Sequence, residues 1–209
     1  MSVRVRAGLC LGLASLCIVA VGACARSVRL DDWDFKGKSS ARASPRVVAL
    51  GQPIPKGGGV YKLGQPYQID GQWHVPREDP YYDRTGVASF YGLDFHGRRT
   101  ANGEIYDMGA LTAAHPTLPL PCYAYVTNLD NGRTILVRIN DRGPYVNNRI
   151  IDLSQAAARE LGYQTRGLAH VRVRYAGPAP LNGDDIYERR FLASQPWHRL
   201  ALSWPARNR

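Results

Sequence analysis

The chain has 209 residues, of which 44% are hydrophobic and 21% charged, a composition typical of one globular domain with flanking segments. The formal net charge is +10, but the sequence has neither a run of five Lys or Arg residues nor a zinc-ligand spacing. We therefore expect no nucleic acid among its partners, no metal and no other cofactor. A basic surface suits an anionic envelope polymer and a membrane face equally well.

Residues 1–23 are typical of an export signal. Two arginines form a positive start, and residues 7–21 form an uncharged apolar stretch that is short for a transmembrane span of about 20 residues. The stretch ends in Val21-Gly22-Ala23-Cys24, which resembles the lipobox of bacterial lipoproteins and implies acylation of Cys24. A plain secretory peptide with an incidental cysteine is the alternative. Ala25 in place of an aspartate indicates the outer membrane, so we expect a lipid-anchored protein on the periplasmic side.

Composition divides the rest of the chain into four segments. Residues 24–60 are polar and rich in proline and glycine, which predicts a lipidated flexible tether. Residues 61–85 hold five aromatic side chains between prolines, and we expect an extended strap lying against the domain. Residues 86–178 form the compact domain. Residues 179–209 form a basic, aromatic extension, for which packing is favoured over a glycan-stacking patch.

Short strands dominate the predicted domain. Alternating apolar and polar residues or β-rich runs predict strands over 86–91, 122–127, 134–140 and 171–175. Asn131-Gly132 predicts a hairpin between the second and the third of these. One helix is expected, with Ser154 as its N-cap and Gly162 at its end. Many short strands, one short helix and long loops predict a mainly β fold, a small β-barrel.

Two stretches of the domain mix glycine turns with polar side chains. The first contains Phe95-His96-Gly97-Arg98-Arg99-Thr100-Ala101-Asn102-Gly103-Glu104 and reaches His115. The second contains Asn140-Asp141-Arg142-Gly143-Pro144 and ends in Asp152-Leu153-Ser154. A site built on loops over a rigid barrel has this character. Taken alone, Asp141 is typical of a turn or ion pair, Glu104 of a solvated loop, and His115 of a structural position.

Together, these motifs resemble the double-psi β-barrel domain of the rare lipoprotein A family. Members of that family are septal-ring-associated lytic transglycosylases. The resemblance covers roughly residues 86–175. It implies a six-stranded double-psi β-barrel and endolytic, non-hydrolytic cleavage of the β-1,4 bond between N-acetylmuramic acid and N-acetylglucosamine. The product would end in 1,6-anhydro-N-acetylmuramic acid. The implied partners are peptidoglycan glycan strands, peptide-stripped strands at daughter-cell separation among them, and septal-ring proteins.

The resemblance also implies roles for particular residues. Asp141, Glu104 and His115 fall on the family's catalytic positions. We expect Asp141 to protonate the leaving oxygen and then to accept the proton of the attacking 6-hydroxyl. Glu104 would orient Asp141, stabilise positive charge or share the proton, since two nearby carboxylates raise one pKa. His115 would bind sugar or position a loop, and Asp152 would brace the barrel.

Four further residues are expected to bind the sugar, namely His96, Arg98, Asn102 and Arg142. One departure from the family is the C-terminus, because about thirty residues follow the barrel and show no SPOR pattern, which leaves septal targeting open. Two alternatives to the enzyme remain: a non-catalytic peptidoglycan-binding lipoprotein, and a structural lipoprotein that ties the outer membrane to the wall. The presence of both Glu104 and Asp141 favours the enzyme.

Overall fold

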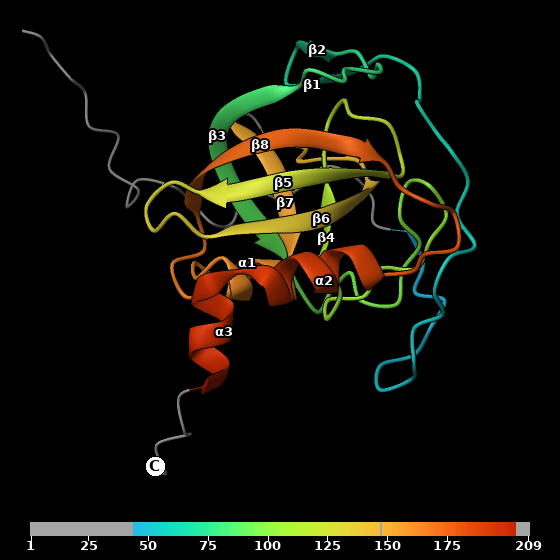
Figure 1. Ribbon diagram of the computed structural model, residues 1–209. Helices are drawn as coiled ribbons and strands as arrows, with labels where there is room; N and C mark the ends of the chain where they lie inside the picture. The colour runs from blue at the N-terminus through green and yellow to red at the C-terminus, as the bar shows by residue number, and fades with distance from the viewer. Residues whose placement is uncertain (1–43, 147, 204–209) are drawn as a thin grey trace, which may run out of the picture. The chain divides into compact units, whose positions relative to one another are not determined.

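Six strands close into a barrel in the order β3-β7-β4-β6-β5-β8 (Figure 1). The computed structural model describes residues 44–146 and 148–203, so the predicted export signal and Cys24 lie outside the described residues. The barrel strands are β3 (Asp83–Tyr91), β4 (Thr112–Ala114), β5 (Cys122–Asn128), β6 (Thr134–Asp141), β7 (Arg149–Ser154) and β8 (Ala169–Pro178). The pairs β3–β7 and β4–β6 are parallel and the other four are antiparallel. The predicted mainly β, six-stranded barrel is confirmed.

The barrel interior is filled by the apolar faces that the alternation predicts. Cys122, Ala124 and Val126 of β5 are fully buried, and so are their counterparts Ile135, Val137 and Ile139 of β6. The opposite faces of these strands are not simply solvated, because Tyr123 and Leu136 form a second small cluster with Ala179 of the tail. Strands that bury both faces are held in register by packing from two sides.

Three helices accompany the barrel. The predicted helix is α1 (Gln155–Glu160), where the Ser154 hydroxyl accepts a hydrogen bond from the N–H of Ala157 at 3.1 Å. Two more helices, α2 (Ile186–Ser194) and α3 (Pro196–Ser203), lie in the tail and were not predicted. The tail packs: Phe191 of α2 lies 5.1 Å from the ring of Tyr125. Among the described residues, no helix is long and apolar enough to span a bilayer.

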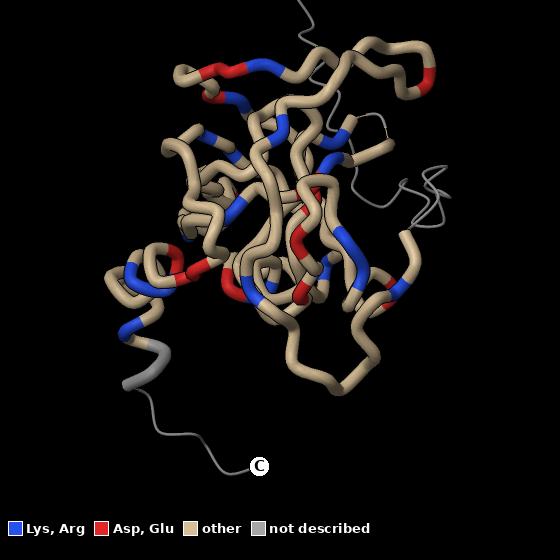
Figure 2. Tube along the Cα trace, turned by 90° about the vertical axis from the view of Figure 1, so that its right-hand side faces the viewer, with Lys and Arg blue, Asp and Glu red and all other residues tan. Residues whose placement is uncertain are grey.

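The segment before the barrel lies along its loops. It forms a two-stranded hairpin of β1 (Tyr67–Ile69) and β2 (Gln72–His74). Lys62 and Leu120 exchange two backbone hydrogen bonds of 2.7 and 3.0 Å. Residues 44–60, predicted as tether, also contact the domain where they are described, since the N–H of Val60 donates to the carbonyl of Asn102 at 2.9 Å. The described Lys and Arg positions are spread over strands, loops and tail, with acidic positions between them (Figure 2).

Candidate active site

Asp141 ends β6 and is held there by the backbone. Its Oδ1 accepts hydrogen bonds from the N–H groups of Ala101 and Arg142, both at 2.8 Å. Burial raises the pKa of Asp141 to about 6, against the opposing effects of these two N–H groups and of the Arg142 charge. The side chain is nevertheless partly exposed. The two hydrogen bonds fix Oδ1 as an acceptor, which leaves Oδ2 to carry a proton that can be donated.

Glu104 is held in a buried ion pair. Its Oε2 accepts hydrogen bonds from Nε of Arg138 at 3.0 Å and from Nδ2 of Asn140 at 2.9 Å, and its Oε1 accepts from Nη2 of Arg138 and Nδ2 of Asn102. Burial acts to raise the pKa of Glu104, but these donors and the Arg138 charge outweigh it, and the net pKa is lowered. Gly59 covers the carboxylate, because a Cβ at Gly59 would lie 2.7 Å from Glu104 Cγ. Glu104 is therefore ionised and enclosed.

His115 follows β4 and is completely buried. Its Nδ1 accepts hydrogen bonds from the N–H groups of Thr117 at 3.1 Å and Leu118 at 3.0 Å, and Tyr82 packs edge-on against its ring at 4.8 Å. Burial, with a smaller effect of the Arg142 charge, lowers the pKa of His115 to about 3. The imidazole is therefore neutral and supports the turn after β4, and the backbone N–H of His115 donates to the carbonyl of Asp141 at 3.1 Å.

The four predicted sugar-binding residues make mostly internal hydrogen bonds. Arg142 donates to the carbonyls of Leu118 at 2.6 Å and Leu63 at 2.6 Å, which ties the strap to the loop after β4. Asn102 joins Glu104 and Thr100. His96 accepts from the N–H of Met108 at 3.3 Å, and Arg98 donates to the carbonyls of Asp94 and Ser44. In the described chain, the Asn102 side chain contacts Glu104, and Arg142 contacts the Asp141 carboxylate through its backbone N–H, while the hydrogen bonds of His96 and Arg98 go elsewhere.

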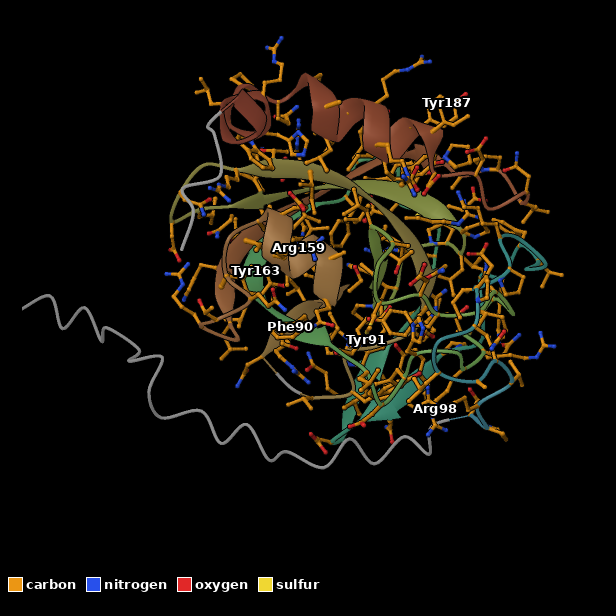
Figure 3. All side chains as sticks on the ribbon, turned by 90° about the horizontal axis from the view of Figure 1, so that it is seen from below. Phe90, Tyr91, Arg98, Arg159, Tyr163 and Tyr187 are labelled. Carbon is orange, nitrogen blue, oxygen red and sulfur yellow. The ribbon has the colours of Figure 1, made fainter. Side chains whose placement is uncertain are left out.

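The sequence interpretation missed several residues of this region. Arg138 and Asn140 were not singled out as partners of Glu104, although two polar residues at i and i+2 on an otherwise apolar strand point to one shared contact. Tyr91 was also missed; its hydroxyl is buried. Burial and the charges of Tyr106, Asp141 and Asp152 raise its pKa, so it stays protonated. In Figure 3, Tyr91 and Arg98 lie away from α2, which carries Tyr187.

The six-stranded barrel matches one known family of domains over nearly all of its strands. The family model described as "Lytic transglycolase" matches residues 83–173. Over these residues the chain is similar to a lytic transglycosylase domain, the similarity that the motifs predict. The match begins at the first residue of β3 and ends within β8.

Particular relatives agree with that domain. The chain is 45% identical over 155 residues to "Endolytic peptidoglycan transglycosylase RlpA" of Pseudomonas aeruginosa, which covers 74% of this chain and 45% of the relative. It is 50% identical over 113 residues to the protein of the same name in Neisseria meningitidis, covering 54% of this chain and 47% of the relative. The chain thus spans less than half the length of these relatives. A solved structure, the Streptomyces papain inhibitor, aligns with a TM-score of 0.39 and 27% identity, covering 46% of this chain and 97% of that one.

Proposed function

We propose that the protein is an endolytic peptidoglycan lytic transglycosylase. It cleaves the β-1,4 bond between N-acetylmuramic acid and N-acetylglucosamine and leaves 1,6-anhydro-N-acetylmuramic acid ends. The observation that carries the proposal is Asp141, a partly exposed carboxyl on a lytic transglycosylase barrel whose burial raises its pKa to about 6. A general acid works best when its pKa lies near the working pH. The similarity to proteins named as endolytic transglycosylases supports the same activity.

The reaction needs one group that gives a proton and takes it back. Asp141 donates its proton from Oδ2 to the glycosidic oxygen as the bond to C1 of the muramic acid breaks, and positive charge develops at the ring. The 6-hydroxyl of the same sugar then attacks C1, and its proton returns to Asp141. The two backbone N–H groups on Oδ1 keep the carboxyl in place in both steps. Water takes no part in the balance, because the hydroxyl is the nucleophile.

Glu104 and His115 act on this site through the backbone. Glu104 orders the turn of residues 100–104, which presents the N–H of Ala101 to Asp141. His115 orders the turn after β4. In this proposal both are positioning residues, and Asp141 is the residue that transfers the proton.

The cellular placement is part of the proposal. We place the barrel on the periplasmic side of the outer membrane, anchored by lipid on Cys24, where glycan strands of the wall and septal-ring proteins are its partners. The motif at Cys24 and the absence of an aspartate after it support this placement. Labelling of the expressed chain with a radioactive fatty acid tests it, with Cys24→Ser as the control that should take up no label.

Digestion of purified peptidoglycan tests the activity. The full-length chain in detergent is incubated with intact and with peptide-stripped glycan, and products are identified by mass spectrometry. We expect anhydro ends from the wild type and none from Asp141→Asn. Glycan that binds but is never cut, on either substrate, would refute the enzyme and leave a binding lipoprotein.

A further inference from the structure

Asp141 is one of two carboxylates that flank the same small residue. Ala114 of β4 is the register partner of Asp141 on one side and of Asp152 on the other. Asp152 in turn pairs with Ser89 of β3. The β4–β6 register shifts between Ala113 and Ala114, which skips Asn140 and brings Asp141 opposite Ala114. Asp141, Ala114, Asp152 and Ser89 therefore form one row across the four strands β6, β4, β7 and β3.

Ala114 separates the two aspartates of this row. Neighbouring strands lie about 4.8 Å apart, so the Cα atoms of Asp141 and Asp152 are separated by about 10 Å. The residue between them in register is Ala114, which is 4% exposed. Both carboxyl groups are partly accessible, Asp152 with a side-chain exposure of 17%.

Asp152 is held by groups that favour its charged form. The Ser89 hydroxyl donates to its Oδ1 at 2.5 Å, and Nη1 of Arg149 lies 3.6 Å from the same oxygen. Arg149 also donates to the Ser89 hydroxyl, so the three side chains are linked. Burial is the largest effect and the net pKa of Asp152 is raised, while the Arg149 charge and the Ser89 hydrogen bond act to lower it. Ile151 and Leu153, on either side of Asp152 in β7, pack in the barrel core. They anchor β7 there, so the Asp152 carboxylate is not needed to hold the strand.

The other ionisable groups near Asp141 are neutral or positive. Tyr91 of β3, Tyr106 of the loop before β4, and Tyr145 of the loop after β6 all have raised pKa values, chiefly because of burial, and remain protonated. Arg142, beside Asp141, is positive and lowers its pKa. Among the described groups that act on Asp141, Asp152 is the one negative charge that opposes Arg142.

We propose that Asp152, held by Ser89 and Arg149, is the second carboxylate of the glycan-cleaving site, and that its negative charge acts across Ala114 on Asp141. This inference rests on the proposed function. It assigns to Asp152 the part that the sequence analysis gave to Glu104, the neighbour that keeps the proton on the acid. Glu104 cannot supply that charge to the row, because Arg138 neutralises it in a buried pair. Asp152 is a positioning residue that acts on Asp141 through its charge.

The pH dependence of cleavage tests the assignment. Asp141 must be protonated to act, so kcat/KM falls as pH rises through its pKa. Replacing Asp152 by Asn removes a negative neighbour, which lowers the pKa of Asp141 and moves this alkaline limb by about one unit to lower pH. With the full-length chain in detergent and peptide-stripped glycan, we expect Asp152→Asn to lower kcat/KM at neutral pH about tenfold or more. Asp152→Glu should restore part of the rate and return the limb toward the wild-type position.

Two further variants make the test specific. Asp130→Asn removes an exposed carboxylate that pairs with Arg166 at 2.9 Å on the β5–β6 hairpin, and should change neither rate nor limb. Ser89→Ala removes the hydroxyl donor of Asp152 and should move the limb in the same direction as Asp152→Asn, by less. Thermal unfolding of each variant shows whether it is folded. If Asp152→Asn does not fold, Ser89→Ala carries the test alone.

A carboxyl ¹³C NMR titration of Asp141 separates this inference from the proposed function. The inference requires a lower Asp141 midpoint in Asp152→Asn, or in Ser89→Ala, than in the wild type. An unchanged midpoint together with an unchanged rate profile overturns it, even if the wild type cleaves glycan. A wild type that makes no anhydro ends but shows the shifted midpoint refutes the transglycosylase and leaves the coupling of the two carboxylates standing.

Discussion

Replacing Glu104 by Gln is the sharpest test of how the site is held together. The Glu104 and Arg138 side chains are 6% and 4% exposed, and the carboxylate accepts from three donor side chains. An amide turns one of these acceptor oxygens into a donor that faces other donors, and it leaves the Arg138 charge buried without a counter-charge. Breaking a buried pair in this way costs about 3–5 kcal/mol. For a chain of this size the midpoint of thermal unfolding should fall by about 6–20 °C.

Circular dichroism measures that midpoint, and anhydro-end release at a temperature where the variant is folded measures activity. We expect a large loss of stability with a smaller loss of activity. The double variant Glu104→Gln/Arg138→Met should be less unstable than the two single losses added together, because it removes both buried charges. A Glu104→Gln protein of unchanged stability that cleaves no glycan would refute this reasoning and place Glu104 on the substrate.

Three other changes have definite expected outcomes. Burial lowers the pKa of His115 to about 3, so between pH 3 and the usual 6.5 the unfolded chain binds a proton that the folded chain does not. The free energy of unfolding in urea should therefore fall by about 1.4 kcal/mol per pH unit as pH drops through this window. His115→Phe should flatten this slope. Gly59→Ala places a Cβ 2.6 Å from Nδ2 of Asn102 and 2.7 Å from Cγ of Glu104, so it should lower the thermal midpoint at a cost of about 1–3 kcal/mol. The pKa of Asp141 is raised from 3.8 to about 6, so its effect on stability has the opposite pH dependence from that of an ion-paired carboxylate. Its contribution to the free energy of unfolding is full below pH 3.8 and is lost as pH rises to about 6. Asp141→Asn should therefore be inactive, yet more stable to urea at neutral pH by up to about 3 kcal/mol.

The longer strands β5 and β6 could be predicted from the local alternation of apolar and polar residues. Alternation along β5 and β6 and the Asn131-Gly132 turn between them describe an antiparallel hairpin, which needs no distant partner. β4 has only three residues, Thr-Ala-Ala, and too short a pattern to detect. The parallel pairings β3–β7 and β4–β6 join segments far apart in the chain, and no local period encodes them. The barrel was therefore predictable as a class, and its strand order was not.

The candidate site shows the same division. The motifs led to Asp141 and Glu104, whose residue types are what the chemistry needs. Their environments depend on residues that are distant in the sequence. Glu104 contacts Arg138, 34 positions away, and Asp141 is linked to Asp152 through their shared register partner Ala114. The helix α2 did leave a signal, since Tyr187 and Phe191 are four residues apart and both meet β5 through aromatic contacts.

The environments of the carboxyl groups, rather than their identity, separate an acid from a brace. Glu104 is enclosed with a guanidinium and two amides, so its charge is compensated and its proton is lost. Asp141 receives backbone N–H groups on one oxygen, has a positive and a negative neighbour that oppose each other, and holds its proton up to a pH of about 6 because burial raises its pKa. A pair of carboxyl groups pushed apart in pKa is the arrangement that assigns one of them to acid catalysis. In the proposed site, the neighbouring carboxylate that helps to raise the pKa of Asp141 is Asp152, and the residue that shapes the loop around Asp141 is Glu104.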